Sequence, residues 1–230
     1  MIPEFAVILP AAGRSVRFGR DKLLEPLAGR SVIARSVEAF LGIGQVRRIV
    51  IPTFDEPGLR RALSEAGVAD ERIAFCSGGP SRAHSVREGA SRCGDAPWLA
   101  VHDAARPLVS RGLIERTLQA AIRFGAAVPA LPVALTIKQA RGPLPAKVRR
   151  TLPRSELWAM QTPQVMRRCD LMTAFEKCPI PLDQVTDDVQ LIEMAGGEVW
   201  LVEGEERNLK ITTELDLQAA ELVLTRPAAP

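Results

Sequence analysis

Short apolar runs alternate along this chain with segments whose apolar residues recur at helical spacing. The continuous run at residues 5–9 is typical of a strand buried on both faces, as in a parallel sheet. Residues 32–41 instead gather their apolar side chains on one side, and Ser31 before them is suited to cap a helix. A strand followed by a helix is the repeating unit of parallel sheets, so this order predicts an α/β fold.

The alternation continues to the C-terminal end. Further strands are expected at residues 46–52, 73–76, 98–102, 126–133 and 199–202, and further helices at residues 58–66, 81–92, 110–124, 168–177, 187–195 and from 213 onward. We expect one domain, residues 1–230, with a Rossmann-like, mostly parallel sheet and helices on both faces. Ligands bind such sheets beyond the carboxyl ends of the strands, which directs attention to the loops after Leu9, Cys76, Val101 and Val133.

Residues 136–161 interrupt this alternation. They contain three prolines, one glycine and six Arg or Lys side chains, and they are long for a connection inside a compact domain. Either they form a disordered loop, or residues 136–139 and 147–151 pair around Gly142 as a two-stranded arm. An arm with an apolar tip usually docks on another surface, often a second subunit.

Composition narrows the chemistry. The formal net charge of +3 is too small to indicate a nucleic-acid-binding surface, so no nucleic-acid partner is expected. Tyrosine is absent, which excludes phenolic acid–base chemistry, and only five of the 30 basic residues are lysines. The four cysteines form no CxxC pair and there are two histidines, so a structural zinc site is not expected.

The chain carries no sign of a membrane or export signal. No apolar run approaches the roughly 20 residues that a membrane helix needs. The N-terminal residues lack the basic region of a signal peptide. The expected location is therefore the cytoplasm, with no membrane partner.

The loop after the first predicted strand carries candidate phosphate-binding chemistry. Residues 10–22 read PAAGRSVRFGRDK; the small residues allow a ligand close to backbone amides, and Arg17 and Lys22 add positive charge. The loop is not a P-loop, because no GK[ST] follows the glycines, and it lacks the GxGxxG pattern of dinucleotide-binding folds. Taken alone, it is equally typical of a solvated, mobile loop.

Two further loops carry candidate chemistry at the same edge. Asp103, in VHDAARP at residues 101–107, stands where a carboxylate could bind a metal or orient a polar ligand, although an ion pair with Arg106 is the commoner explanation. Residues 78–86, GGPSRAHSV, lead into a helix whose N-terminal amides favour an anion or a polar base edge, with Ser85 adding a hydroxyl. Capping by Ser81 explains the same residues without a ligand.

Together these segments resemble the 2-C-methyl-D-erythritol 4-phosphate cytidylyltransferase family over nearly the full chain. The motifs that carry the resemblance are, in order, PAAGRSVRFGRDK, GGPSRAHSV, VHDAARP, TPQ, TDD and VEGEERNLKIT. The resemblance implies a nucleotidyltransferase-type fold and a reaction in which methylerythritol phosphate attacks the α-phosphorus of CTP and releases pyrophosphate, with Mg²⁺ required. In-line phosphoryl chemistry needs positioning and charge neutralisation, which agrees with the residues present.

The resemblance also implies a role for each matching residue. The nucleotide would be lined by Pro10, Ala11, Ala12, Gly13, Gly79, Ser85 and Ala104. The catalytic cations would be Arg17, Lys22 and Lys210. The methylerythritol end would be surrounded by Asp103, Arg106, Thr162 and Thr186, with Asp103 also a candidate metal ligand. Residues 136–157 match the family's dimerisation arm, which implies a homodimer in which Thr136 and Arg154 enter the partner's site.

Two positions depart from the family pattern, and three other interpretations remain open. Asp21 stands where many members carry proline, and Leu23 where glutamine is common; both flank Lys22. The nearest alternative is a ribitol-5-phosphate cytidylyltransferase, which would keep the CTP loop and change the acceptor pocket. A nicotinamide-dependent oxidoreductase is disfavoured by the glycine pattern, and a non-catalytic nucleotide-binding module by the full set of charged site residues.

Overall fold

The computed structural model describes residues 2–13, 15 and 18–225, and its centre is an eight-stranded sheet. The strand order is β10-β7-β11-β6-β1-β4-β5, and β12 also pairs with β7. The strands are β1 (Phe5–Ile8), β4 (Val46–Thr53), β5 (Ile73–Ser77), β6 (Trp98–Val101), β7 (Ala126–Pro132), β10 (Trp158–Met160), β11 (Gln164–Arg167) and β12 (Trp200–Glu203). Strands β6, β1, β4 and β5 run parallel, as do β12 and β7, so the predicted mostly parallel sheet is confirmed.

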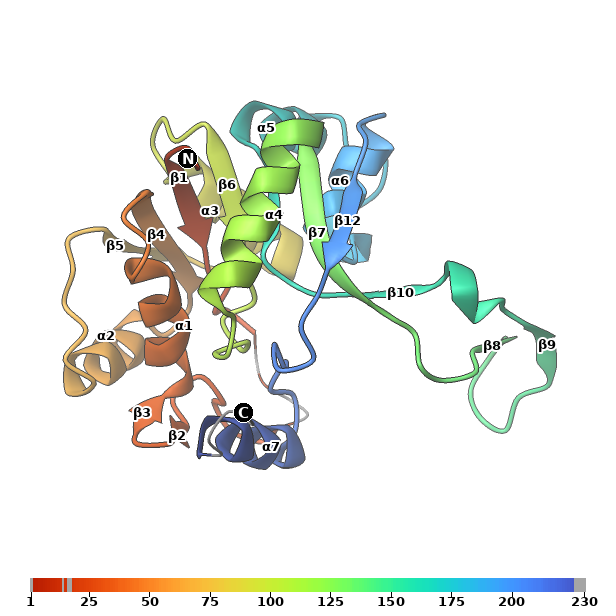
Figure 1. Cartoon of the computed structure of the whole chain (residues 1–230), viewed down its shortest axis with the longest axis horizontal. Helices are drawn as coiled ribbons and strands as arrows, with labels where there is room; N and C mark the ends of the chain where they lie inside the picture. The colour runs from red at the N-terminus through yellow and green to blue at the C-terminus, as the bar shows by residue number, and fades with distance from the viewer. Residues whose placement is uncertain (1, 14, 16–17, 226–230) are drawn as a thin grey trace.

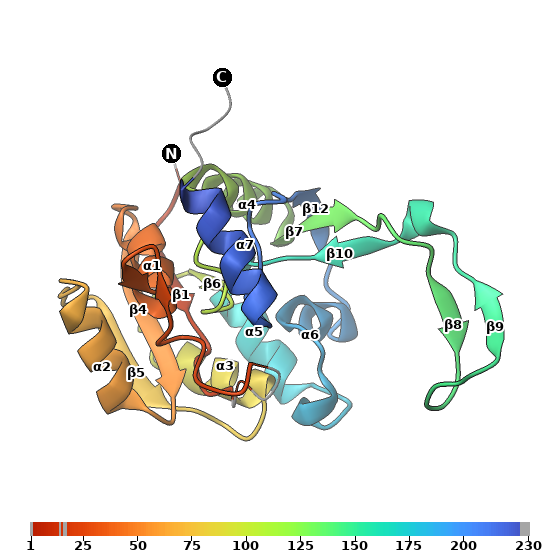
Figure 2. The same cartoon turned by 90° about the horizontal axis from the view of Figure 1, so that it is seen from below.

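Helices cover both faces of this sheet (Figures 1 and 2). One face carries α1 (Val32–Leu41), α2 (Glu56–Glu65) and α4 (Arg111–Phe124), and the other α3 (Arg82–Ser91), α5 (Arg168–Glu176) and α6 (Asp188–Met194). The last helix, α7 (Glu214–Thr225), packs near a small hairpin of β2 (Pro26–Leu27) and β3 (Arg30–Ser31). In the view of Figure 2, α7 crosses the front of the molecule. Among the described residues, no helix is long and apolar enough to cross a membrane.

The first strand shows why an apolar run becomes the centre of such a sheet. Its side chains alternate: Phe5 and Val7 pack with α1 and α4, while Ala6 and Ile8 pack on the other face with α3, and all four are fully buried. A Cβ on Gly89 of α3 would lie only 2.6 Å from Ile8 Cγ2. Glycine at this position therefore lets α3 approach the sheet closely, which brings its N-terminus to the carboxyl edge.

The sequence pattern does not predict β10 and β11. Strand β11 is antiparallel and lies between β6 and β7, with Gln164 opposite Val101 and Val165 opposite Ala127. Both strands are only three or four residues long, and their hydrogen-bonding partners are distant in sequence. Short segments of this kind carry too little local periodicity to reveal a strand, because the pairing is decided by tertiary contacts.

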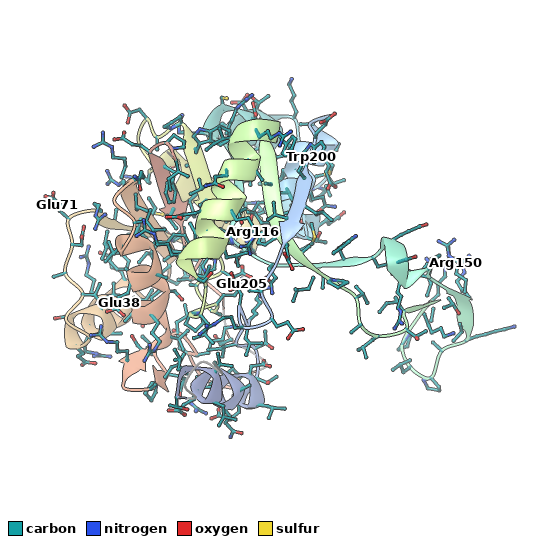
Figure 3. All side chains as sticks on the ribbon, in the orientation of Figure 1. Glu38, Glu71, Arg116, Arg150, Trp200 and Glu205 are labelled. Carbon is teal, nitrogen blue, oxygen red and sulfur yellow. The ribbon has the colours of Figure 1, made fainter. Side chains whose placement is uncertain are left out.

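The segment at residues 136–157 forms an arm rather than a disordered loop. Strand β8 (Lys138–Ala140) pairs antiparallel with β9 (Val148–Thr151). The arm projects sideways from the folded body (Figure 1), and Arg150, labelled in Figure 3, lies well away from the sheet. Leu144 at its turn is 89% exposed, which leaves an apolar tip available to another surface.

Candidate active site

A cavity of about 480 Å³ opens at the carboxyl edge of the sheet. Its wall comes from the loops after β1, β4, β5 and β6, from the start of α3 and from the loop before α7. All the residues predicted to contact the nucleotide line it, namely Pro10, Ala11, Ala12, Gly13, Gly79, Ser85 and Ala104. The charged side chains of the described wall are those of Lys22, Arg82, Asp103 and Lys210.

Glycine shapes one wall of this cavity. A Cβ on Gly78 would lie 2.2 Å from Ala12 Cβ, and a Cβ on Gly79 would lie 2.4 Å from His84 Cβ. These glycines therefore let the loop after β5 pack against both the loop after β1 and the first turn of α3. The Gly79 N–H donates to Ser85 Oγ at 3.0 Å. The predicted N-cap is confirmed, because Ser81 Oγ accepts a hydrogen bond from the His84 N–H.

Asp103 is the centre of charge in the cavity. Its Oδ2 lies 2.7 Å from Lys210 Nζ and 3.6 Å from Arg106 Nε, and its Oδ1 lies 3.1 Å from Arg82 Nε. Burial favours the neutral acid, but Arg82 and then Lys210 outweigh burial and lower the Asp103 pKa. The carboxylate therefore stays ionised at neutral pH and holds three cations at one point.

A chain of hydrogen bonds fixes the loop that carries Asp103. His102 Nε2 donates to the Arg106 carbonyl at 3.0 Å, so its Nδ1 accepts from the Thr162 hydroxyl at 3.0 Å. The Thr162 oxygen accepts in turn from the Asp103 N–H at 3.1 Å. Burial lowers the pKa of His102 to about 4, so this histidine is neutral and acts as a structural connector.

Replacing Thr162 with valine should destabilise the protein by about 1–3 kcal/mol, because the buried Asp103 N–H and His102 Nδ1 would both lose their partner. The matched control is Thr225→Val, which removes an exposed hydroxyl bonded only to carbonyls of its own helix. This control should change the free energy of unfolding by less than about 0.5 kcal/mol. Urea unfolding measures both changes, and equal values would refute the structural role of Thr162.

Several predicted acceptor-site residues do not line the cavity. Arg106 turns its Nη1 to the Asn208 carbonyl at 2.7 Å, so it supports the loop that carries Lys210. Thr162 is buried behind Asp103. Thr186 is exposed and bonds Gln190 Oε1.

The predicted arm residues and one predicted cation also lie elsewhere. Thr136 and Arg154 belong to the arm and are not among the residues that line the cavity of their own chain, and Arg154 Nη1 donates to the Ala134 carbonyl at 2.8 Å. Arg17 lies outside the described residues. Of the three predicted catalytic cations, Lys22 and Lys210 line the cavity.

The sequence motifs did not identify Arg82 and Asp188 as members of the site. Arg82 lines the cavity and pairs with Asp103, and its Nη1 lies 2.8 Å from Asp188 Oδ2. A cation in the first turn of a helix is unfavourable. The arginine in SRAHSV could therefore have indicated a residue that needs an acidic partner elsewhere in the fold. Asp188 gave no such signal, since an acidic residue is common at a helix start.

The donors for a divalent metal are few. Among the described residues, no group of three His, Cys, Asp or Glu side chains could hold a metal ion. Asp103 is the single carboxylate of the described cavity wall. Magnesium is often held by one or two carboxylates together with substrate phosphates and waters, so the site fits an ion that arrives with a phosphate ligand.

Comparisons with known proteins agree with this geometry. A family model described as 2-C-methyl-D-erythritol 4-phosphate cytidylyltransferase matches residues 5–226. A protein of that name from Gloeobacter violaceus is 40% identical over 223 residues, covering 95% of each chain. One from Bacillus velezensis is 37% identical over 226 residues, covering 96% of each. A relative from Anaeromyxobacter named bifunctional enzyme IspD/IspF is 40% identical, and this chain spans 58% of its length.

Solved structures show the same architecture. The 4-diphosphocytidyl-2C-methyl-D-erythritol synthase of Anaerococcus prevotii superposes with a TM-score of 0.83 at 25% identity, covering 97% of this chain and 99% of the other. The 2-C-methyl-D-erythritol 4-phosphate cytidylyltransferase of Francisella tularensis superposes with a TM-score of 0.81 at 29% identity, covering 94% and 98%. The likeness therefore includes nearly the whole fold around the cavity.

Proposed function

Because the chain belongs to the 2-C-methyl-D-erythritol 4-phosphate cytidylyltransferase family, we propose that its cavity at the carboxyl edge is where CTP reacts with methylerythritol phosphate. The chain is a cytidylyltransferase of isoprenoid biosynthesis. The observation that supports the proposed location is the meeting of small-residue loops with Lys22, Arg82 and Lys210 around one ionised Asp103. Such a wall suits a polyanion whose sugar and base lie against backbone groups.

The small-residue loops form the nucleotide seat in this proposal. Residues 10–13 and Gly79 offer close backbone approach, and Ser85 holds the Gly79 amide in place. Ala104 follows Asp103 in the cavity wall. A pocket of backbone groups recognises a base edge by hydrogen bonds whose positions are set by the fold rather than by mobile side chains.

The reaction needs charge neutralisation more than a nucleophilic side chain. A phosphate oxygen of methylerythritol phosphate forms the new bond to the α-phosphorus, and the bond from that phosphorus to the bridging oxygen breaks. The electron pair leaves with pyrophosphate, and no covalent enzyme intermediate is needed. Lys22 and Lys210 border the cavity where they can neutralise the phosphates, and Arg17 belongs to the same loop as Lys22.

A divalent cation, in our proposal Mg²⁺, accompanies the triphosphate. Asp103 is the residue of the described wall that would hold it. The ion would neutralise negative charge on the phosphates. The proposed location of the protein is the cytoplasm, the compartment that holds CTP.

The arm completes the acceptor side in this proposal, as part of a homodimer. In its own chain the arm leaves the body and exposes Leu144 and Val148, and Leu135 just before the arm is exposed as well. Exposed apolar side chains on a projecting hairpin favour burial against another subunit. Thr136 and Arg154 would then reach the partner's cavity, where Arg154 can bind a phosphate with two parallel hydrogen bonds.

Pyrophosphate release by the purified protein tests the reaction and the acceptor together. With Mg²⁺ and CTP, we expect release to depend on methylerythritol phosphate and to fall to background with ribitol 5-phosphate or with no acceptor. Chelation of the divalent ion should abolish release, and added Mg²⁺ should restore it. The ribitol alternative is not favoured, because the matched relatives are named for methylerythritol phosphate.

Each other outcome of this assay has a definite meaning. Release with ribitol 5-phosphate alone would keep the CTP site and reassign the acceptor. No pyrophosphate release with either acceptor would contradict the proposed reaction and favour a nucleotide-binding module. Release that persists without any divalent ion would contradict the metal requirement.

A further inference from the structure

Arg82 occupies a position that its own helix does not favour. It is the first residue of α3, where the free backbone amides already carry partial positive charge. The helix start is capped by Ser81, so Arg82 is not needed there for capping. A cation at this place therefore requires partners from other parts of the fold.

Two carboxylates provide those partners. Arg82 Nε lies 3.1 Å from Asp103 Oδ1, and Arg82 Nη1 lies 2.8 Å from Asp188 Oδ2. Asp188 is the first residue of α6, its side chain is fully buried, and its backbone N–H is held by Gln164 Oε1 at 2.8 Å. The guanidinium thus joins α3 to α6 and to the loop after β6.

Stability alone does not explain this arrangement. Removing two charges from water is costly, so a buried ion pair often contributes little more to stability than a neutral pair of the same shape. Burial raises the pKa of Asp188, although Arg82 acts in the opposite direction. Because Arg82 also contacts Asp103 in the cavity wall, a role in the site accounts for the pair better than stability does.

The contacts of Arg82 affect how tightly Asp103 holds Lys210. One carboxylate, Asp103, is shared by Arg82, Arg106 and Lys210, so each cation is held less tightly than it would be alone. The Lys210 side chain is 40% exposed, whereas that of Arg106 is 11% exposed. Arg82 is fixed at its other end by Asp188. Lys210 is thus the member of the cluster that can leave Asp103.

We propose that Arg82, anchored by Asp188, is a positioning residue that occupies Oδ1 of Asp103 and keeps Lys210 exchangeable from Oδ2 to an incoming substrate phosphate. The inference rests on the proposed function, which places that phosphate in this cavity. Without Arg82, Lys210 and Arg106 would be the remaining partners of the Asp103 carboxylate, and its attraction for each would be stronger. Lys210 would then be held back from the phosphate.

The test replaces the buried ion pair with a neutral polar pair, Arg82→Gln with Asp188→Asn. The double substitution leaves the net charge of the protein unchanged, and Asp103 keeps Arg106 and Lys210 as partners, so it disturbs the interior less than either single substitution would. It is measured with Lys210 present and in a Lys210→Ala background. With Lys210 present, kcat should fall about 10-fold and CTP affinity should weaken, as expected for groups in one ionic network. In the Lys210→Ala background the same substitution should cause a clearly smaller fold-change in kcat and CTP affinity, since only the direct contribution of Arg82 to the cavity wall is then lost.

The matched control is the neutral pair Arg111→Gln with Glu115→Gln, which removes an exposed ion pair on α4. It should leave kcat and CTP affinity unchanged in both backgrounds. Equal losses from the Arg82–Asp188 substitution with and without Lys210 would show a general structural role and overturn the inference. An unchanged kcat with Lys210 present would overturn it as well.

CTP affinity, measured by calorimetry, separates this inference from the proposed reaction. A wild-type protein that binds CTP but transfers its cytidylyl group to neither acceptor would contradict the reaction. The coupling between the Arg82–Asp188 pair and Lys210 would then still be decided by CTP affinity in the four variants. A thermal unfolding midpoint for each variant confirms that affinities are compared between folded proteins.

Discussion

Lys22→Ala should lower kcat by about 100-fold or more, because it removes a cation that neutralises charge developing in the transition state. Lys22 lines the same cavity as Asp103 and Lys210, on the loop that follows β1. The chain contains few lysines, and Lys210 is the one other lysine of the described cavity wall. No third lysine there can replace Lys22. Steady-state pyrophosphate release with saturating CTP and methylerythritol phosphate measures the change.

The control for this prediction is Lys177→Ala, which removes an exposed lysine at the end of α5, outside the cavity. Its kcat should match that of the wild type. Arg17→Ala should resemble Lys22→Ala, since the sequence places both cations in one loop. Near wild-type turnover in the Lys22 variant would remove Lys22 from the mechanism and shift the catalytic role to Lys210.

Mixing two inactive variants should restore about a quarter of wild-type activity if the arm completes the partner's site. The variants are Lys22→Ala, defective in the cavity, and Arg154→Ala, defective in the arm. In a mixed dimer, one site combines the altered cavity with the altered arm, and the other combines two intact parts. Random exchange makes half of the dimers mixed, and half of their sites are intact. Each variant alone should have at most about one hundredth of wild-type activity.

An active site formed within one subunit would give a different result in this mixing experiment. If Arg154 acted in its own chain, both sites of every mixed dimer would carry a defect, and no activity would return. The mixture of Lys177→Ala with Arg154→Ala is the control for mixing itself, since it should show half of wild-type activity whether or not the subunits exchange. Sedimentation velocity gives the oligomeric state, and a monomer with full activity would refute the shared site.

For the arm, the sequence pattern predicted a segment outside the core but not its secondary structure. Its unusual length and its proline and Arg content indicated a segment outside the compact core. Its strands β8 and β9 are exposed along their whole length, so no buried face imposed an apolar alternation that could decide between a hairpin and a loop. Only the paired backbone resolves the choice in favour of a hairpin.

The charged site was predicted in part. Lys22, Asp103 and Lys210 stood out because each follows a predicted strand or lies in a recognisable motif, and parallel strands deliver such residues to one edge. Thr162 and Arg106 were also named, yet their polar atoms face the loop backbone rather than the cavity. Direction of a side chain depends on rotamers and neighbouring loops, which motif position does not specify.

By itself, the sequence determined the α/β class, the main strands and helices, the family, and the loops in which the chemistry would lie. Those features depend on local periodicity, capping residues and short motifs, which are written in neighbouring positions. Only the tertiary structure decided the antiparallel insertion of β11 and the ion cluster of Asp188, Arg82, Asp103 and Lys210. Each of these joins segments far apart in the chain, and the strength of such contacts is set by burial and distance in the folded molecule.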